Sequence, residues 1–199
     1  MNIAIFASGQ GSNFEAIARA IKRGYIKAQL KLLVTDKENA FVRVRAKKFG
    51  VRDVYVNPKC YPSRLAFDKA IIRILEQEDI DAIILAGFMR IVTPYFVKRY
   101  NHRIINIHPA LLPAFRGERA IERAFACGRK VTGVTVHFVD EKVDHGPIIL
   151  QKKVTIKAGT SLARLTAAIH KIEHILYPRA VKLLAENRIT IKNRHVTIR

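Results

Sequence analysis

Tryptophan is absent from this sequence, cysteine and methionine each occur only twice, and acidic residues are scarce. The two cysteines, Cys60 and Cys127, are too few for a disulfide framework or a cysteine-rich zinc site. No apolar run approaches the roughly 20 residues that a membrane-spanning helix needs. The first residues also lack a basic segment followed by a long apolar one, so we expect no signal peptide. We therefore expect a cytoplasmic globular protein.

Basic residues, in contrast, are abundant. The chain carries 36 Lys and Arg against 16 Asp and Glu, which gives a net charge of +20. Such a charge makes nucleic acid the first partner to consider, with a polyanionic small substrate or a generally basic proteome as alternatives. The basic residues are scattered, however, and are not interleaved with aromatic residues on one face, so we do not expect nucleic acid to be the partner.

Hydrophobic residues make up 49% of the 199 residues, which is enough for a buried core in one domain. Continuous apolar runs at 2–7, 30–34 and 81–87 are typical of strands buried on both faces of a parallel sheet. Helical patterns separate them. We therefore predict an α/β fold, a doubly wound and mostly parallel sheet with helices on both faces. Residues 1–199 are expected to form one domain, with a Rossmann-like half at 1–100 and a second half at 101–199.

The second half is less regular. A strand is expected at 103–109 and a helix at 120–127. The segments 131–140 and 146–156 suggest a hairpin-like pair that extends the sheet. A long helical pattern covers 160–184, and the last residues form two short alternating runs around Lys192-Asn193, which predicts a terminal hairpin.

A glycine-rich loop, Ser8-Gly9-Gln10-Gly11-Ser12-Asn13, joins the first strand to the first helix. Gly9 and Gly11 allow the backbone to approach an anion, and the helix N-terminal amides supply donors together with Ser12 and Asn13. The third glycine of a dinucleotide loop is missing, because Phe14 stands there, and no Lys-Ser/Thr ending follows. A small monophosphate fits best, and a strand-to-helix turn without ligand is the alternative. Asp36, at the end of the second strand, resembles a ribose-binding acid.

Three polar residues stand where buried strands end. Asn106 and His108 share one face of the predicted strand, since side chains alternate along a strand. Asp144 lies in the loop before a later strand. An amide, an imidazole and a carboxylate can hold an oxyanion and transfer a proton. We expect the carboxylate to raise the pKa of His108 and keep the ring protonated. A capped strand end is the alternative for His108.

Other catalytic classes lack their residues. The sequence has no serine or cysteine in a nucleophile elbow, which argues against a covalent acyl-enzyme. It has no HExxH motif and no close cluster of His, Cys and Asp, so we expect no metal.

Four motifs occur together in this chain: SGQGSN at 8–13, GFMRI at 87–91, NIHPALLPAFRG at 106–117 and DHGPII at 144–149. In combination they resemble the folate-dependent formyltransferase family, over nearly the whole chain, and in particular its branch that formylates glycinamide ribonucleotide. The resemblance implies transfer of a formyl group from 10-formyltetrahydrofolate to the amine of glycinamide ribonucleotide, a step of purine biosynthesis. It leaves a homodimer open.

The resemblance also implies roles for individual residues. Asn106, His108 and Asp144 would be catalytic, with Asn106 and protonated His108 holding the oxyanion and Asp144 relaying the proton. Residues that would bind the ribonucleotide are Gly11, Ser12, Asn13 and Glu173. Residues that would bind the folate are Arg64, Met89, Arg90, Ile91, Val92 and Asn106. Of the two halves, 1–100 would be the phosphate-binding one and 101–199 the catalytic and folate-binding one. From the residue pattern alone, without the resemblance, Glu173 is expected on an exposed face of the late helix.

The chain departs from the family at two places. Glu118 and Arg119 stand where many relatives carry a histidine, and Ala110 replaces a common serine. Two other activities on the same scaffold are alternatives. A methionyl-tRNA formyltransferase would carry a further C-terminal barrel of roughly 60 residues, whereas only residues 185–199 follow the long helix. A formyltetrahydrofolate hydrolase would carry an additional N-terminal domain, which we do not expect here.

Overall fold

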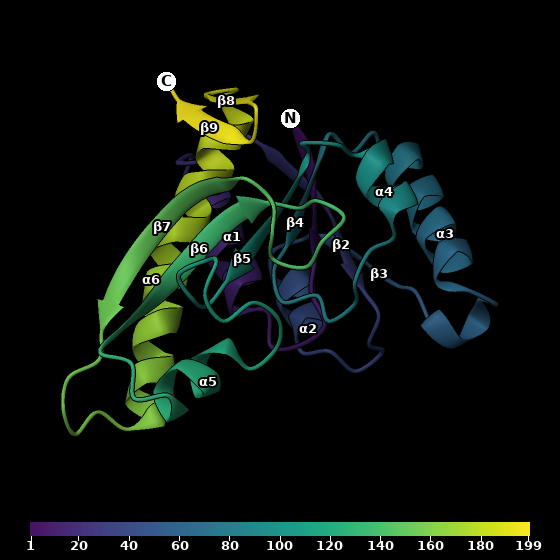
Figure 1. Ribbon diagram of the computed structural model, residues 1–199. Helices are drawn as coiled ribbons and strands as arrows, with labels where there is room; N and C mark the ends of the chain where they lie inside the picture. Colours follow the sequence, from purple (N-terminus) through teal and green to yellow (C-terminus); the bar gives the residue numbers. More distant parts are fainter. The chain divides into compact units, whose positions relative to one another are not determined.

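The computed structural model describes residues 1–199 and divides them into two compact units, Met1–Ile105 and Asn106–Arg199. Seven strands form one sheet in the order β3-β2-β1-β4-β5-β6-β7. Strand β5, Ile104–His108, carries the boundary between the units. The predicted α/β class with a mostly parallel sheet is therefore confirmed (Figure 1).

The first unit alternates strands and helices. Its elements are β1 (Asn2–Phe6), α1 (Ser12–Lys22), β2 (Gln29–Thr35), α2 (Val42–Lys48), β3 (Arg52–Tyr55), the short 3-10 helix η1 (Pro58–Cys60), α3 (Arg64–Gln77), β4 (Ala82–Leu85) and α4 (Pro94–Arg99). Strand β1 pairs in parallel with β2 and β4, and β2 pairs in parallel with β3. Strands β1 and β4 are almost entirely buried, as their continuous apolar sequences predict.

Helix α3 begins at Arg64, directly after Ser63. The Ser63 hydroxyl accepts a hydrogen bond from the amide of Ala66 at 3.1 Å and so caps the helix. Helix α4 was not predicted. It has only six residues, and its start is marked by Thr93, whose hydroxyl accepts from the amide of Phe96, and by Pro94 in the first turn. A Thr-Pro pair is thus the signal that could have found it.

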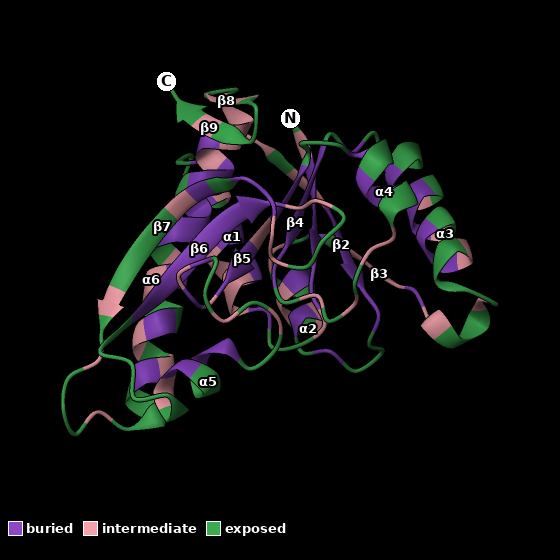
Figure 2. Cartoon of the chain, in the orientation of Figure 1, coloured by how far each residue is buried: buried purple, intermediate pink, exposed green.

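The second unit contains α5 (Ala120–Ala126), β6 (Val131–Phe138), β7 (Ile148–Thr155), α6 (Leu162–Ala185), β8 (Ile189–Lys192) and β9 (His195–Ile198). Strands β6 and β7 pair antiparallel, as the hairpin-like pattern predicts. Helix α6 packs along both strands (Figure 1). Figure 2 shows that β6 is buried along nearly its whole length, whereas β7, the last strand of the sheet, is largely exposed.

The chain ends in a hairpin that forms a separate two-stranded sheet, β8-β9. Lys192 pairs with His195, so the turn consists of Asn193 and Arg194, one residue later than predicted. Both turn residues have positive φ, 48° and 68°. No helix in the structure combines the length and the apolar character needed to cross a bilayer.

Candidate active site

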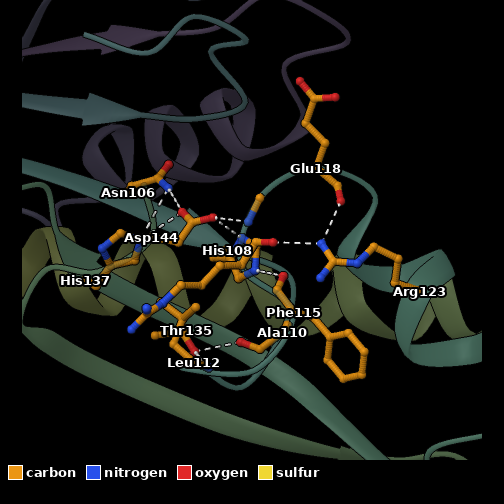
Figure 3. Close-up of polar contacts among 12 residues, drawn as sticks. Asn106, His108, Ala110, Leu112, Phe115, Glu118, Arg123, Thr135, His137 and Asp144 are labelled. Carbon is orange, nitrogen blue, oxygen red and sulfur yellow. Dashed lines mark hydrogen bonds and ion pairs between the residues drawn. The ribbon is translucent and has the colours of Figure 1, made fainter. Parts of the chain in front are cut away.

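The structure brings Asn106, His108 and Asp144 together within the second unit (Figure 3). Asn106 and His108 lie on β5 and point to one side, as the alternation of side chains along a strand predicts. Asp144 comes from the loop between β6 and β7. Its Oδ1 lies 3.3 Å from Asn106 Nδ2, and its Oδ2 lies 3.2 Å from His108 Nδ1.

Asp144 is the centre of this cluster, because both of its oxygens are engaged. Oδ2 also accepts a hydrogen bond of 2.8 Å from the amide of Gly117, and Oδ1 lies 3.5 Å from His137 Nε2. Burial by itself would raise the pKa of Asp144. The hydrogen bonds from His137 and Gly117, with the electrostatic interactions of His108 and His137, outweigh burial and lower the pKa of this carboxyl group. Asp144 is therefore ionised at neutral pH.

His108 lies between two acceptors. On one side its Nδ1 faces Asp144, and on the other its Nε2 lies 2.9 Å from the carbonyl oxygen of Phe115. The pKa of His108 is nevertheless lowered, because burial outweighs the raising effects of Asp144 and of the Phe115 carbonyl. The expectation that Asp144 keeps this ring protonated is thus wrong for the resting protein, since desolvation was not visible in the sequence.

A neutral imidazole has one N–H to share between these two acceptors. The surroundings of His108 therefore suit a ring that gains a proton, because both N–H groups of an imidazolium would find a partner in place. The site holds an ionised carboxylate next to a neutral, proton-accepting ring. Such a pair titrates jointly.

His137 is a member of this cluster that the sequence did not single out. It lies on β6 and is buried, with its Nδ1 2.7 Å from the carbonyl oxygen of Phe138. Its Nε2 faces Asn106 Nδ2 at 3.3 Å and Asp144 Oδ1 at 3.5 Å. The sequence places His137 on the polar side of an alternating strand. That position indicates a role in the cluster only when it is known that Asn106 lies next to it in the sheet.

The loop that carries Asp144 is shaped by two backbone features. Asp144 itself has a positive φ of 48°, which aspartate tolerates better than most residues. Gly146 follows, and a Cβ atom there would lie 1.8 Å from the carbonyl oxygen of Phe138, so no larger residue fits. The tight passage over Phe138 leads the chain toward β7, which begins at Ile148.

The segment after β5 is fixed by a buried threonine. Thr135 Oγ1 donates to the carbonyl of Ala110 at 2.6 Å and accepts from the amide of Leu112 at 3.1 Å. Gln151 Nε2 donates to the Leu112 carbonyl and to Thr135 Oγ1, both at 2.9 Å. Ala110 is fully buried, so it contributes to packing rather than to the polar cluster.

Beyond this segment, Arg123 of α5 donates to the carbonyls of Arg116 and Glu118 at 2.7 and 3.2 Å (Figure 3). This contact holds the backbone on both sides of Gly117, which binds Asp144. The side chains of Glu118 and Arg119 are exposed. Neither of these exposed side chains belongs to the buried cluster around Asp144.

The glycine loop belongs to the first unit. Gly11 precedes α1 with a φ of 73°, and a Cβ atom there would lie 2.4 Å from Val42 Cγ2, so both conformation and space require glycine. Ser12 and Asn13 form the first turn of α1 and are half-buried. Asp36 accepts a hydrogen bond of 2.5 Å from the Ser8 hydroxyl. Asp36 therefore has Ser8 of the glycine loop as its hydrogen-bond partner, whereas its position in the sequence suggested a ribose.

The segment 89–92, also in the first unit, presents apolar side chains to solvent. Met89 and Ile91 are 68% and 58% exposed, while Val92 is half-buried. The backbone of the segment is fixed by Ser8, whose hydroxyl accepts from Met89 N at 2.9 Å, and by Arg64, whose Nη2 donates to the Ile91 carbonyl at 2.7 Å.

Two further contacts complete this segment. Asp68 accepts from the amide of Thr93 at 2.7 Å, and burial raises the pKa of that carboxyl group. The Arg90 guanidinium lies 4.9 Å from the centre of the Phe67 ring. Exposed apolar side chains on a well-held backbone are typical of a surface that receives an apolar ligand.

Glu173 lies on α6 and is 4% exposed, so its placement on an exposed helix face is wrong. Its Oε2 lies 3.0 Å from His170 Nδ1, and this hydrogen bond raises the pKa of His170. Burial, together with the nearby Glu173 charge, raises the pKa of Tyr177. No group of three or more His, Cys, Asp or Glu side chains in the structure has the arrangement of a metal site.

The fold agrees with what comparison with known proteins shows. Residues 1–181 match the family model described as Formyl transferase, so the chain belongs to the formyl transferase family. It is 46% identical over 181 residues to the phosphoribosylglycinamide formyltransferase of Bacillus subtilis, which covers 91% of this chain and 93% of that protein.

Two solved structures resemble it as well. Glycinamide ribonucleotide transformylase 1 from Symbiobacterium toebii matches with a TM-score of 0.97 and 40% identity, covering 100% of this chain and 93% of that one. A formyltetrahydrofolate deformylase from Pseudomonas syringae matches with a TM-score of 0.91 over 99% of this chain and 65% of that one. Its identity is only 22%, so this second likeness shows the fold alone.

Proposed function

We propose that this protein transfers the formyl group of 10-formyltetrahydrofolate to the amine of glycinamide ribonucleotide, in the synthesis of purines. The observation that carries the proposal is the ionised Asp144 beside the neutral His108 and the amide of Asn106, in a chain of the formyl transferase family. The products are N-formylglycinamide ribonucleotide and tetrahydrofolate.

The proposed reaction begins when the neutral amine attacks the formyl carbon and forms a C–N bond. The carbonyl oxygen becomes an oxyanion, and the Asn106 amide donates a hydrogen bond to it. In the resting cluster, Asn106 Nδ2 has only long contacts of 3.3 Å to Asp144 and His137, so one N–H can turn to a ligand at small cost.

The proton of the attacking amine must then reach the departing folate nitrogen. The His108–Asp144 pair takes this proton and becomes an imidazolium next to a carboxylate, with the second N–H facing Phe115. The pair returns the proton when the bond between the formyl carbon and the folate nitrogen breaks. His108 is thereby a proton acceptor that starts neutral, in place of the protonated group expected from the sequence.

The two substrates are assigned to different segments. Gly11, Ser12 and Asn13 would bind the phosphate, since the loop combines a close backbone approach with helix amides. Arg64 and residues 89–92 would contact the folate, because this segment exposes apolar side chains on a fixed backbone. Glu173 is proposed for the ribonucleotide, as a carboxylate kept in place by burial.

The test is a direct assay with three arms. The protein is mixed with glycinamide ribonucleotide and 10-formyltetrahydrofolate, and tetrahydrofolate and the formylated product are measured. Charged initiator methionyl-tRNA replaces the ribonucleotide in the second arm, and no acceptor is added in the third. We expect product only in the first arm. Formylation of the tRNA alone would overturn the proposal in favour of a tRNA formyltransferase, and formate release without acceptor would favour a hydrolase.

The remaining predictions concern the setting of the reaction. The cytoplasm as its location, and the exclusion of nucleic acid as a partner, rest on sequence composition and stay predictions. A homodimer likewise stays open to a measurement of mass in solution.

A further inference from the structure

The loop that carries Asp144 is held by the C-terminal hairpin, β8-β9. Arg194, in the turn of this hairpin, donates from Nη1 to Asp140 Oδ2 at 3.1 Å and from Nη2 to the carbonyl oxygen of His145 at 2.7 Å. Nη2 also lies 3.0 Å from His145 Nδ1, which in turn lies 2.8 Å from Asp140 Oδ2. One guanidinium therefore joins the two ends of the segment 140–145.

Arg194 makes these contacts from a backbone conformation that arginine does not favour. A two-residue hairpin turn with positive φ at both positions prefers Asn-Gly, and here the second position is Arg194 with φ 68°. A side chain in this region costs about 1–2 kcal/mol relative to the right-handed conformation. A residue keeps a strained backbone conformation of this kind when surrounding contacts hold it there, and such residues often lie at functional positions. The contacts of Arg194 with the loop are such contacts.

The interaction is half-exposed, so its contribution to global stability is small. The Arg194 side chain is 55% exposed and that of Asp140 25%. Its significance is geometric, because the carbonyl that Arg194 binds belongs to His145, the residue next to Asp144. Asp144 has a positive φ, and Gly146 is confined by Phe138 on the far side. Arg194 contacts Asp140 and His145, the two ends of the segment that precedes Gly146.

We propose that Arg194 is a positioning residue, which holds the segment 140–145 so that the Asp144 carboxylate stays aligned with His108. This inference rests on the proposed function, since alignment matters only if the His108–Asp144 pair transfers the proton. The hairpin lies beyond residues 1–181, the part that matches the family model. The positioning is thus supplied by a segment that follows the residues matched by the family model.

The decisive variant is Arg194→Gly. It removes the guanidinium and places the favoured residue in the turn, so the hairpin folds at least as well as before. We expect kcat to fall about 10-fold, because small displacements of catalytic groups are costly, while KM for both substrates changes less than 2-fold. Lys192→Gln, which removes one positive charge from the same hairpin, is the matched control and should retain the original kcat. Arg194→Lys keeps the charge but cannot reach both partners, so its kcat should fall between the two.

Two readouts separate positioning from a merely structural role. Amide hydrogen exchange of residues 140–146 should become faster in Arg194→Gly, with exchange in β6 and α6 unchanged. Asp140→Asn should lower kcat as well, and the loss in the double variant should be smaller than the product of the two single losses, because both substitutions remove the Arg194–Asp140 contact. Unchanged loop exchange together with an unchanged kcat would overturn the inference. If the unmodified protein fails to formylate glycinamide ribonucleotide, the proposed function fails, and the exchange measurement still decides whether Arg194 holds the loop.

Discussion

His108 and Asp144 lie 3.2 Å apart, nitrogen to oxygen, with the pKa of each group below its ordinary value. The His108 ring is neutral because it is buried. The Asp144 carboxylate is charged because Asn106, Gly117, His108 and His137 surround its two oxygens. Together they can accept one proton and hold it as an ion pair, which neither group could do alone in the same surroundings.

Because the two groups act as a unit, their substitutions should not add. His108→Ala and Asp144→Asn should each lower kcat by about 10²–10⁴-fold, with KM changed only modestly. The double variant should be as slow as the slower single variant. Single-turnover kinetics measure this directly, and losses that multiply would show that the groups act in separate steps.

His137 should control the ionisation of Asp144. Its hydrogen bond is the first of the interactions that lower the pKa of this carboxyl group against burial. His137→Phe removes that bond at similar ring volume, so the pKa of Asp144 should rise. The reaction needs the ionised form, and the acid limb of the kcat profile should therefore move to higher pH. The direction follows because more protons are then bound to Asp144 at any given acidic pH.

Thr132→Val is the matched control for this experiment. Thr132 is buried on the same strand, and its hydroxyl has no hydrogen-bond partner. Its replacement should leave the pH profile in place. A His137→Phe profile that coincides with that of the unmodified protein would contradict the role assigned to His137.

Gly11→Ala should weaken binding of the ribonucleotide. Alanine there meets a φ of 73° and a contact of 2.4 Å with Val42 Cγ2, so the loop must move. We expect a KM for glycinamide ribonucleotide raised about 10-fold or more and a stability loss of about 2–4 kcal/mol from conformation and overpacking together.

Gly24→Ala separates these two causes. Gly24 has nearly the same φ, 74°, but no atom within 4 Å of the added Cβ. Its substitution should cost about 1–2 kcal/mol through conformation alone, without a change in KM. Urea unfolding and steady-state kinetics on both variants give the comparison, and equal KM values for all three proteins would refute the phosphate assignment.

The net charge of +20 should speed the association of the protein with its anionic substrates. A ribose phosphate and a folate with its glutamate carboxylates are both attracted by a positive surface, and salt screens this attraction. Raising ionic strength from about 0.02 to 0.3 M should increase KM several-fold while kcat changes little. Sodium chloride and potassium acetate series exclude specific ion effects, and a KM independent of salt would contradict steering.

The sequence predicts the sheet well because its buried strands are continuous apolar runs, as in β1 and β4. It also predicts that Asn106 and His108 share a face, because the period of a strand is two. What it misses depends on tertiary surroundings. His137 and Thr135 alternate with apolar residues on β6, as in a strand with one face in water, yet both are buried. They are polar because they hydrogen-bond to neighbouring segments.

Tertiary surroundings also explain two wrong predictions, the protonation of His108 and the position of the turn in the C-terminal hairpin. An adjacent carboxylate raises a histidine pKa in water, but the burial of His108 reverses the outcome and has no local signature. The terminal turn lies at Asn193-Arg194, and arginine is not a residue that a sequence pattern places at positive φ. Its position there became intelligible only with its contacts to Asp140 and His145.

The cluster around Asp144 also has a consequence for folding kinetics. Its hydrogen bonds join residues 38 positions apart for Asn106 and 27 positions apart for Gly117, and Asn106 contacts His137 across 31 positions. None of these contacts forms until distant segments of the chain have met, and structures that depend on such non-local pairing form more slowly than those with local contacts. On refolding, helical signal should return before catalytic competence, and the interval between the two measures the time that the chain needs to assemble β5, β6 and their loops around one carboxylate.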